Sequence, residues 1–331
     1  MNQLLPTPDE IGHGYRVLSK NQVRGVNGVI ELKSGQPGPR LYVGTCTHGN
    51  EKITAGLVVP LLKGLAGGGI ELIRGSVVIA VNNLLAASQN KREADGDLNM
   101  NRLPPDIWDG RLRTSKMPAV LRMRELINAG LLDVTHGFDA HTIPTPADQC
   151  KIHIKGSTDF AKEIGIRDYL THITEHQQDA NGVGTLAFGN YIGGVENDIP
   201  VIEVEGGGPH DEQRIINGLV NGLLAVLGRL DMVDENLITR EEGEQREYEI
   251  TDYYIAQAGF RPEKEFDNFA RVKRGQLIAH DTTDSGRPPF FAPHAGHIVF
   301  PPTFETFGKD GDSWWISKPV RRTMQQFVRA K

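Results

Sequence analysis

Leu41-Tyr42-Val43-Gly44-Thr45-Cys46-Thr47-His48-Gly49-Asn50-Glu51 runs from an apolar segment into a polar turn that contains a glycine. A short apolar run of this kind is typical of strands that are buried in parallel sheets. Open sheets of that type bind ligands at the carboxyl ends of their strands. The turn therefore presents the imidazole of His48 and the carboxylate of Glu51 where a ligand would bind.

The spacing of His48 and Glu51, three residues apart in a tight turn, lets one imidazole and one carboxylate face a single cation. Zn²⁺ accepts such nitrogen and oxygen ligands at about 2.0–2.2 Å, and a catalytic zinc site needs a third protein ligand and an open position for water. The same residue pair also occurs in ordinary polar loops that contact solvent. The pair therefore predicts a metal site only together with the rest of the chain.

Length and composition define a globular protein. The 331 residues suffice for one large domain, a smaller one and a substantial buried core. Of these residues 38% are hydrophobic, 24% are charged and 38 are glycines, which indicates many tight turns. No run approaches the roughly 18 apolar residues of a membrane helix, and Met1–Pro6 lacks the features of a signal peptide. We therefore expect a cytoplasmic protein without a membrane partner.

The net charge and the cysteine content indicate which partners and which redox compartment to expect. A formal net charge of −6 argues against nucleic acid as a partner, because proteins that bind it normally carry a basic patch or domain. Two cysteines, Cys46 and Cys150, cannot build a disulfide framework and fit a reducing compartment. Cys46 lies in the proposed site turn, so a role as metal ligand or nucleophile competes with burial, the commoner state of a free cysteine.

Strand and helix patterns alternate through the first two thirds of the chain, and this alternation predicts an open α/β sheet flanked by helices. Residues 84–118 show little periodicity and predict a long functional loop region. Gly130 suits the position just after the end of a helix. The predicted strands cover 28–32, which is the one element expected in residues 1–40, then 41–43, 76–81, 134–141 and 199–205, and the predicted helices cover 53–62, 119–129 and 212–230.

The pattern changes after Met232. Helical periodicity gives way to proline, glycine and alternating segments such as 276–280 and 297–300. We therefore predict a first domain over residues 1–232 and a smaller β-rich domain over residues 233–331.

Several predicted strands end in residues that carry chemistry. In an extended chain Asp139 and His141 project to the same face, and the last strand of the first domain delivers Glu205 just before Gly206-Gly207-Gly208. Parallel strands have their carboxyl ends at one edge of the sheet, where ligands bind. His48, His141 and Glu205 are therefore expected at the same edge.

Four segments far apart in the chain belong to one pattern: His48-Gly49-Asn50-Glu51, Arg92 to Arg102, Asp139-Ala140-His141, and Glu205 before the three glycines. They resemble the succinylglutamate desuccinylase/aspartoacylase family, whose members are zinc hydrolases built on a carboxypeptidase-like α/β domain. The segments 273–276 and 292–296 also look like the β-rich second domain of that family. The order and wide separation of the motifs argue against coincidence.

The resemblance implies one zinc ion per chain, held by His48, Glu51 and His141. Two imidazoles and one carboxylate leave a net positive site that lowers the pKa of bound water towards about 7. Asp139 would then hold a ligand imidazole in the correct tautomer. The alternative for Asp139 is an ordinary solvated carboxylate at a strand end.

Glu205 matches the catalytic acid/base of the family. The resemblance implies that it takes a proton from the zinc-bound water and passes it to the leaving amine, a role that suits a carboxylate of raised pKa. Glu203, two residues earlier on the same strand, is the rival. Glu205 is preferred because it directly precedes the glycines, as the residue of the family does.

Arg92 and Arg102 supply the anion-binding side that the resemblance implies. A planar guanidinium can bind a carboxylate through two parallel hydrogen bonds. Arg92 would polarise the scissile carbonyl, and Asn101 with Arg102 would hold the substrate carboxylate. The family usually has Asp-Leu-Asn-Arg or Asp-Met-Asn-Arg, whereas this chain has Asp97-Leu98-Asn99-Met100-Asn101-Arg102, so Asn99 is the alternative to Asn101.

These features predict a zinc-carboxypeptidase-like mixed open sheet flanked by helices, with a smaller β-rich C-terminal domain. The predicted activity is that of a zinc-dependent amidohydrolase, which removes an acyl group from the nitrogen of an N-acyl amino acid or a related small amine. Residues 142–195 should line the substrate pocket, and a homo-oligomer is compatible with the sequence. Two alternatives remain, a zinc carboxypeptidase acting on small peptides and a non-catalytic metal- or ligand-binding module.

Overall fold

The structure is a computed structural model of the 331-residue chain. Most of the predicted pocket segment 142–195 lies outside the residues that it describes. The described residues are 5–65, 69–103, 107–108, 110–143, 150–155, 158–171, 201–207, 212–255, 260–283, 286–299 and 313–330.

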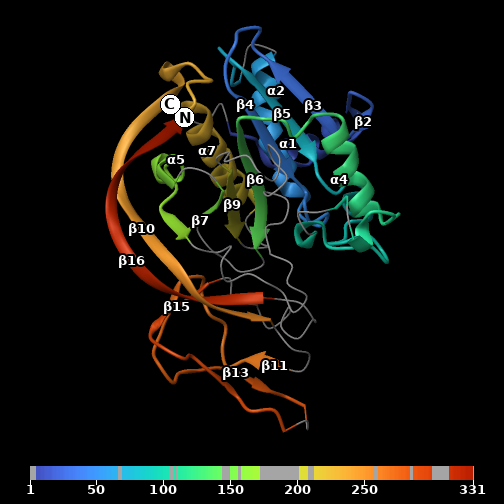
Figure 1. Cartoon of the computed structure of the whole chain (residues 1–331). Coiled ribbons are helices and arrows are strands. Elements are labelled where there is room, and N and C mark those ends of the chain that lie inside the picture. Colours follow the sequence, from blue (N-terminus) through green and yellow to red (C-terminus); the bar gives the residue numbers. More distant parts are fainter. Residues whose placement is uncertain are drawn as a thin grey trace.

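Within these ranges, eleven strands form one mixed sheet (Figure 1). They are β3 (Val29–Lys33), β4 (Arg40–Thr45), β5 (Ser76–Val81), β6 (His136–Ile143), β7 (Cys150–Lys155), β8 (Asp168–Thr171), β9 (Val201–Gly207), β10 (Ile238–Ile255), β12 (Ala270–Val272), β15 (Gly296–Val299) and β16 (Ser313–Ala330). The strand order is β12-β15-β16-β10-β8-β7-β9-β6-β4-β5-β3. The strands β9, β6, β4 and β5 are parallel neighbours, so their carboxyl ends share one edge.

β5 shows that both faces of the sheet are buried. Its fully buried side chains alternate between two hydrophobic clusters. Val77, Ile79 and Val81 belong to the first cluster, whereas Val78 and Ala80 belong to the second. A strand buried on both faces reads as a continuous apolar run, which is why this strand is predicted with the correct bounds.

Helices cover both faces. The helices α1 (Pro8–Lys20), α2 (Val58–Leu65) and α7 (Glu212–Arg229) contribute to the first cluster, and α4 (Pro118–Asn128) contributes to the second. Gly130, which follows the cap residue Ala129 at the end of α4, adopts a left-handed conformation (φ 62°), as predicted. Shorter helical segments are α3 (Leu84–Gln89), α5 (Thr158–Glu163) and the 3-10 helices Lys52–Leu57, Met100–Arg102, Gly110–Leu112 and Glu235–Leu237.

The C-terminal third is rich in strands, as the sequence predicts. β10 pairs antiparallel with β16, and Figure 1 shows the two as a long curved ribbon. A small hydrophobic cluster that includes Phe266, Val272 and Ile278 lies in this part. The remaining strands are β11 (Phe260–Pro262), β13 (Leu277–Asp281) and β14 (Phe290–Phe291), which form a three-stranded sheet, and the pair β1 (Gln22–Val23) and β2 (Val26–Asn27).

The predicted domain boundary after residue 232 falls in a connected region. β10 pairs parallel with β8, so the main sheet continues across the boundary. Tyr248 and Ile250 of β10 also join the second cluster, which α4 covers. The division into 1–232 and 233–331 therefore stays a prediction, in a molecule whose two parts share a sheet.

Several helical segments differ from the sequence prediction. The helix α1 lies in residues 1–40, where the strand 28–32 is the one expected element. The predicted helix over 53–62 is a 3-10 helix followed by α2. Pro60 lies in the first turn of α2, where its missing amide hydrogen costs no helical hydrogen bond. The predicted loop 84–118 begins with α3, because Asn83 accepts a hydrogen bond from the Ala86 amide (3.1 Å) and so starts a helix.

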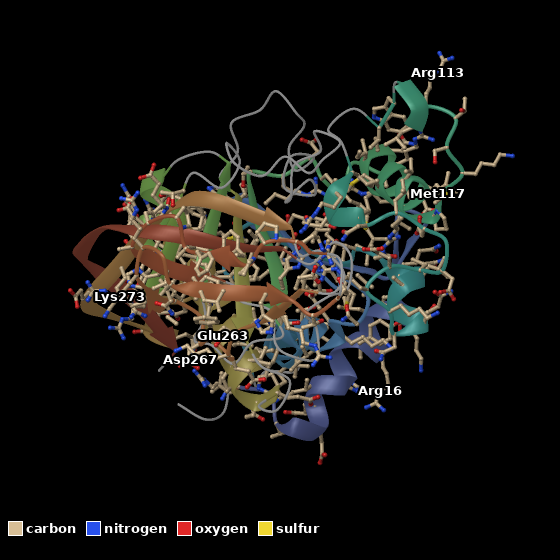
Figure 2. All side chains as sticks on the ribbon, turned by 90° about the horizontal axis from the view of Figure 1, so that it is seen from below. Arg16, Arg113, Met117, Glu263, Asp267 and Lys273 are labelled. Carbon is tan, nitrogen blue, oxygen red and sulfur yellow. The ribbon has the colours of Figure 1, made fainter. Side chains whose placement is uncertain are left out.

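The periphery of the molecule carries charged side chains. Figure 2 shows Arg16, Arg113 and Lys273 at its margin. Within the described ranges, no helix combines the length and the apolar character that crossing a membrane requires.

Candidate metal centre

The turn after β4 carries His48 and Glu51 on a tightly bonded backbone. Cys46 adopts φ 52°, a left-handed conformation that residues with a side chain rarely take. Its amide donates to Thr54 Oγ1 (2.9 Å), and that hydroxyl donates to the Glu51 carbonyl oxygen (2.7 Å). The Glu51 amide donates to the His48 carbonyl oxygen (3.0 Å). These bonds fix the direction in which the chain leaves the strand.

Gly49, between the two candidate ligands, lets the turn approach α3. A Cβ atom at this position would lie 2.1 Å from the Ala86 carbonyl carbon and 2.2 Å from the Ala87 nitrogen. The Gly49 amide donates to the Arg92 carbonyl oxygen (3.1 Å), which ties the turn to the segment after α3. Only glycine fits this close approach.

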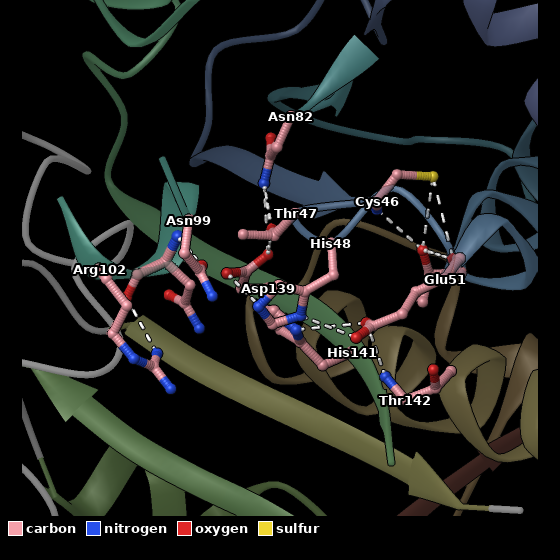
Figure 3. Close-up of polar contacts among 12 residues, drawn as sticks. Cys46, Thr47, His48, Glu51, Asn82, Asn99, Arg102, Asp139, His141 and Thr142 are labelled. Atoms are coloured by element: carbon pink, nitrogen blue, oxygen red, sulfur yellow. Dashed lines mark hydrogen bonds and ion pairs between the residues drawn. The ribbon is translucent and has the colours of Figure 1, made fainter. Parts of the chain in front are cut away.

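His48, Glu51 and His141 form one buried cluster (Figure 3). The atoms that they offer to a metal all lie within 4.8 Å of one another. Glu51 faces both imidazoles, with Oε1 2.8 Å from His48 Nδ1 and Oε2 3.3 Å from His141 Nδ1. Oε2 also accepts a hydrogen bond from the Thr142 amide (2.9 Å). The carboxylate is therefore held by the end of β6 as well as by its own turn.

The protonation states of the cluster suit metal ligands. Burial and the positive charge of Arg92 lower the pKa of His48 to about 3, against the opposing effect of Glu51. Burial alone would raise the pKa of Glu51, but the imidazoles of His48 and His141 outweigh it and hold that pKa well below its usual range. At neutral pH the cluster presents an ionised carboxylate beside a neutral imidazole, the forms that bind metals.

The donor set fits a zinc ion. Two imidazole nitrogens and one carboxylate oxygen are a known ligand combination of catalytic zinc sites. The Nε2 atom of His48 is buried and has no hydrogen-bond partner among the described residues, so this imidazole has a nitrogen that the protein leaves unpaired. In the part of the chain that the structure describes, this is the group of His, Cys, Asp and Glu side chains close enough to hold a metal. Zinc binding itself stays a prediction.

Asp139 contacts His141 on the side away from Glu51. Its Oδ2 lies 3.2 Å from His141 Nε2, and the residue is fully buried. Both ring nitrogens of His141 face a carboxylate, Nε2 that of Asp139 and Nδ1 that of Glu51. A metal ion held by Glu51 and Nδ1 would leave the proton of the neutral imidazole on Nε2, facing Asp139. The Nδ1 lone pair of His141 then points towards Glu51 and the candidate metal position. Burial excludes the alternative of a solvated carboxylate at a strand end.

The predicted anion-binding residues lie between α3 and α4. Arg92 is exposed, and its charge is close enough to lower the pKa of His48. Arg102 ends the 3-10 helix Met100–Arg102 and donates from Nη1 to the Asn101 carbonyl oxygen (3.2 Å). Figure 3 shows Arg102 on the Asp139 side of the cluster.

Asn99 and Asn101 have different surroundings. The Asn99 side chain accepts a hydrogen bond from the Asn101 amide (2.9 Å) and so caps the 3-10 helix. Asn101 is 3% exposed, and its Oδ1 atom is buried without a hydrogen-bond partner among the described residues. The side chain of Asn101 thus keeps unused binding capacity, whereas that of Asn99 holds the local backbone.

Glu205 lies on β9 opposite His141 of β6, and Glu203 lies opposite Asp139. Glu205 is therefore the nearer of the two to the carboxyl end of the strand and to a candidate ligand along the sheet. The side chains of β9 lie outside the part that the structure describes. The choice of Glu205 over Glu203 as acid/base accordingly stays a prediction.

Cys46 is a buried thiol. It is fully shielded from solvent, and burial raises its pKa to about 12. A thiol needs to lose its proton to act as a nucleophile or a metal ligand. Cys46 therefore fits the role of a buried structural residue better than that of a metal ligand or nucleophile.

Three residues near the cluster have no role in the sequence prediction. Tyr42, Thr47 and Asn82 are fully buried and join a hydrogen-bond network with Asp139. One sequence signal was available for Asn82, a polar residue at the carboxyl end of the strand next to β4, where site residues gather. Thr47, in the turn after β4, carries the same signal, whereas Tyr42 carries none because it lies within an apolar strand.

Fold and cluster together define an α/β protein with a candidate metal centre at the carboxyl ends of parallel strands. No protein-family model matches the chain, and no curated protein matches its sequence. Solved structures match it over most of its length. A succinylglutamate desuccinylase/aspartoacylase from Rhodobacter sphaeroides is 16% identical with a TM-score of 0.60, over 88% of this chain and 89% of that one.

Two further structures extend the comparison. The ectoine utilization protein EutE from Ruegeria pomeroyi is 19% identical with a TM-score of 0.58, over 88% of each chain. Murine aminoacylase 3 is 16% identical with a TM-score of 0.58, over 89% of this chain and 99% of that one. This chain therefore has the fold of the succinylglutamate desuccinylase/aspartoacylase proteins, which confirms the predicted fold class. Function has to be argued from the site.

Proposed function

We propose that this protein is a zinc-dependent amidohydrolase that removes the acyl group from the nitrogen of an N-acyl amino acid or a related small amine. The observation that carries the proposal is the buried convergence of His48, Glu51 and His141 at the ends of two parallel strands. The shared fold supports it, because the similar structures include proteins described as succinylglutamate desuccinylases and an aminoacylase. The four ordered motifs of the sequence support membership of the same family.

The chemistry divides among the residues of the chain. A zinc ion held by His48, Glu51 and His141 would supply a Lewis acid that activates water and polarises an amide carbonyl. The carboxylate of Glu205 would accept a proton from the attacking water and deliver it to the leaving nitrogen. The guanidinium of Arg92 would stabilise negative charge as it develops on the carbonyl oxygen.

Substrate orientation would depend on Asn101 and Arg102. A guanidinium and an amide next to each other can bind the carboxylate of an amino acid and so fix the position of its acylated nitrogen. The proposal includes one zinc ion per chain, a small-molecule substrate in the cytoplasm, and no nucleic-acid or membrane partner. A homo-oligomer is compatible with it.

The metal is tested by elemental analysis of protein purified without added metal. We expect close to one zinc per chain in the wild type and almost none in His141→Ala. His136→Ala is the matched control, because His136 lies at the opposite end of the same strand. Zinc retained by His141→Ala, or a folded wild type without metal, would contradict the ligand set.

The reaction is tested with a panel of N-acyl amino acids. Glu205→Gln should lower kcat by at least about 100-fold, the usual contribution of a general acid/base, and keep its zinc. Glu203→Gln should keep most of the activity. An active Glu205→Gln enzyme would refute the assigned role, and a wild type that binds zinc but hydrolyses none of the panel would favour a non-catalytic metal-binding module.

A further inference from the structure

A chain of buried hydrogen bonds leads from the core to the candidate ligand His141. The Tyr42 hydroxyl donates to Asn82 Oδ1 (2.7 Å), and Asn82 Nδ2 donates to Thr47 Oγ1 (2.8 Å). Thr47 Oγ1 donates to Asp139 Oδ1 (3.1 Å), and Asp139 Oδ2 lies 3.2 Å from His141 Nε2. All five side chains are at most 1% exposed. Figure 3 shows the part from Asn82 to His141.

The direction of these bonds follows from Tyr42. Burial raises the pKa of its hydroxyl, although the nearby Arg122 acts in the opposite sense, so the hydroxyl keeps its proton and can donate to Asn82. The Asn82 Nδ2 atom lies 3.4 Å from Asp139 Oδ1, which is an acceptor. If the Asn82 side-chain amide were flipped, its oxygen would take the place of Nδ2 and face Asp139 Oδ1. Two acceptors in contact are unfavourable when buried. The tyrosine therefore fixes which end of the amide faces Asp139.

The consequence reaches His141 through the carboxylate. Because Asn82 donates to Thr47, the hydroxyl proton of Thr47 is directed to Asp139 Oδ1. With that oxygen occupied by donors, Oδ2 is left to face the imidazole. The carboxylate cannot rotate without breaking buried bonds, so it holds the proton of His141 on Nε2 and the ring at one angle.

The neighbouring backbone has room for these contacts only because of a glycine. A Cβ atom on Gly44 of β4 would lie 2.4 Å from Asp139 Oδ1 and 2.6 Å from Asn82 Nδ2. On the other side, Arg122 of α4 donates to the carbonyl oxygens of Val81 (2.7 Å) and Asn82 (3.1 Å). The backbone that carries Asn82 is therefore held by a buried cation.

We propose that Tyr42, Asn82 and Thr47 form a positioning relay, which orients Asp139 and thereby sets the tautomer and the angle of His141 for metal binding. The relay rests on the proposed function, since it needs a metal at His141. Its members act through Asp139 and are positioning residues.

The test compares metal affinity in variants that remove single hydroxyl groups. Tyr42→Phe should weaken Zn²⁺ binding by about 10- to 100-fold in competition with a chelator, as expected when a ligand loses its supporting hydrogen bonds. It should also change the visible absorption spectrum of the Co²⁺-substituted protein, which reports ligand geometry. Tyr169→Phe is the matched control, because Tyr169 is an equally buried tyrosine of β8 on the other face of the sheet. This control should leave both the affinity and the spectrum unchanged.

A second pair of variants guards against a fold defect in Tyr42→Phe. Thr47→Val should weaken Zn²⁺ binding in the same way, whereas Thr47→Ser, which keeps the hydroxyl, should restore the affinity. Wild-type affinity in both Tyr42→Phe and Thr47→Val would overturn the relay and leave the proposed function intact. A folded wild type that binds neither Zn²⁺ nor Co²⁺ would overturn the proposed metal site and the relay with it.

Discussion

Asn99 and Asn101 are two residues apart, and the structure gives their side chains different partners. Asn99 accepts a hydrogen bond from the Asn101 amide, so it stabilises the short helix that carries Arg102. Asn101 has a buried oxygen that no described residue contacts. Leaving a buried polar atom unpaired costs about 1–3 kcal/mol, and such atoms in native proteins call for an explanation. A substrate N–H group that donates to Asn101 Oδ1 would supply one, and Nδ2 of the same side chain is the atom that would donate to a substrate carboxylate.

This difference makes the two asparagines separable by kinetics. Asn101→Ala should raise KM for an N-acyl amino acid by about tenfold or more, the value of one hydrogen bond to a charged group, and leave the zinc content unchanged. Asn99→Ala should instead lower the free energy of unfolding by about 1 kcal/mol, as loss of a cap does, with a smaller effect on KM. A KM effect confined to Asn99→Ala would assign substrate binding to Asn99.

For single residues, the sequence predicts a site where a metal-binding or reactive side chain lies at the end of a predicted strand. His48, Glu51 and His141 could be singled out because they follow apolar runs, and parallel strands place such residues at one edge. Tyr42 could not be singled out, because it reads as one more apolar residue of a buried strand. Its role depends on a partner 40 residues away in the sequence, Asn82. That contact exists only once β4 and β5 pair.

The helix α1 illustrates how an element is fixed by its ends. The Glu10 carboxylate accepts hydrogen bonds from the Thr7 amide (2.9 Å) and hydroxyl (3.0 Å) at the start of the helix. It also contacts Lys63 of α2 at 2.8 Å. Together these contacts lower the pKa of Glu10 to about 2, with the Lys63 hydrogen bond as the largest cause.

Glu10→Gln removes the charge and keeps an acceptor at the helix start. Because the folded pKa of Glu10 lies below the unfolded value of 4.5, its stabilising effect is complete above about pH 4.5 and is lost as the pH falls through about 2. At pH 7 we expect a loss of about 1 kcal/mol, a modest value because side chains of Glu10 and Lys63 are 34% and 28% exposed. Urea unfolding at pH 7 and at pH 3 measures the difference, which should shrink at the lower pH.

Lys63→Gln is the companion variant for the same contact. It should cost about as much as Glu10→Gln at pH 7, and the double variant should cost little more than either, because both remove one interaction. A loss in Glu10→Gln that is independent of pH would mean that the charge of Glu10 has no part in it.

A helix or strand can be predicted when its own residues determine its structure. It is missed when packing or strand pairing with other parts of the chain determines it. β5 is predicted from its continuous apolar run, and α7 from its apolar residues at helical spacing. The helix α1 is not, since Gly12 and Gly14 weaken its helical pattern. Gly14 is explained by packing, because a Cβ atom there would lie 2.2 Å from the Ala55 carbonyl oxygen. β10 is not predicted either, because its Arg- and Glu-rich sequence is held extended by pairing with β16 and β8.

The whole molecule is joined across the predicted boundary by more than the chain itself. β10 adds to the main sheet beside β8. Arg246 of β10 binds both oxygens of Asp168 of β8, at 2.6 Å and 2.5 Å, and the Asp168 side chain is 2% exposed. The Arg246 side chain is 27% exposed, so the pair is partly buried, and removing Arg246 would take this partner from the buried Asp168 carboxylate and destabilise the fold. Ile238 extends the connection, because it belongs to the first cluster together with residues of α7.

We therefore expect the full chain to unfold in one cooperative transition, although its sequence reads as two domains. A chain that ends after residue 232 would expose the edge of β8 and the apolar surface that Tyr248 and Ile250 cover. Unpaired strand edges and uncovered apolar surface favour aggregation, so the shortened chain should melt well below the full chain or aggregate. Calorimetry of both chains measures this. Two separate transitions in the full chain, one of them retained by residues 1–232, would contradict the shared sheet as the source of stability. If the sheet is shared, Arg246→Met should lower the melting temperature of the single transition. If the two parts are independent, it should leave the transition of residues 1–232 unchanged.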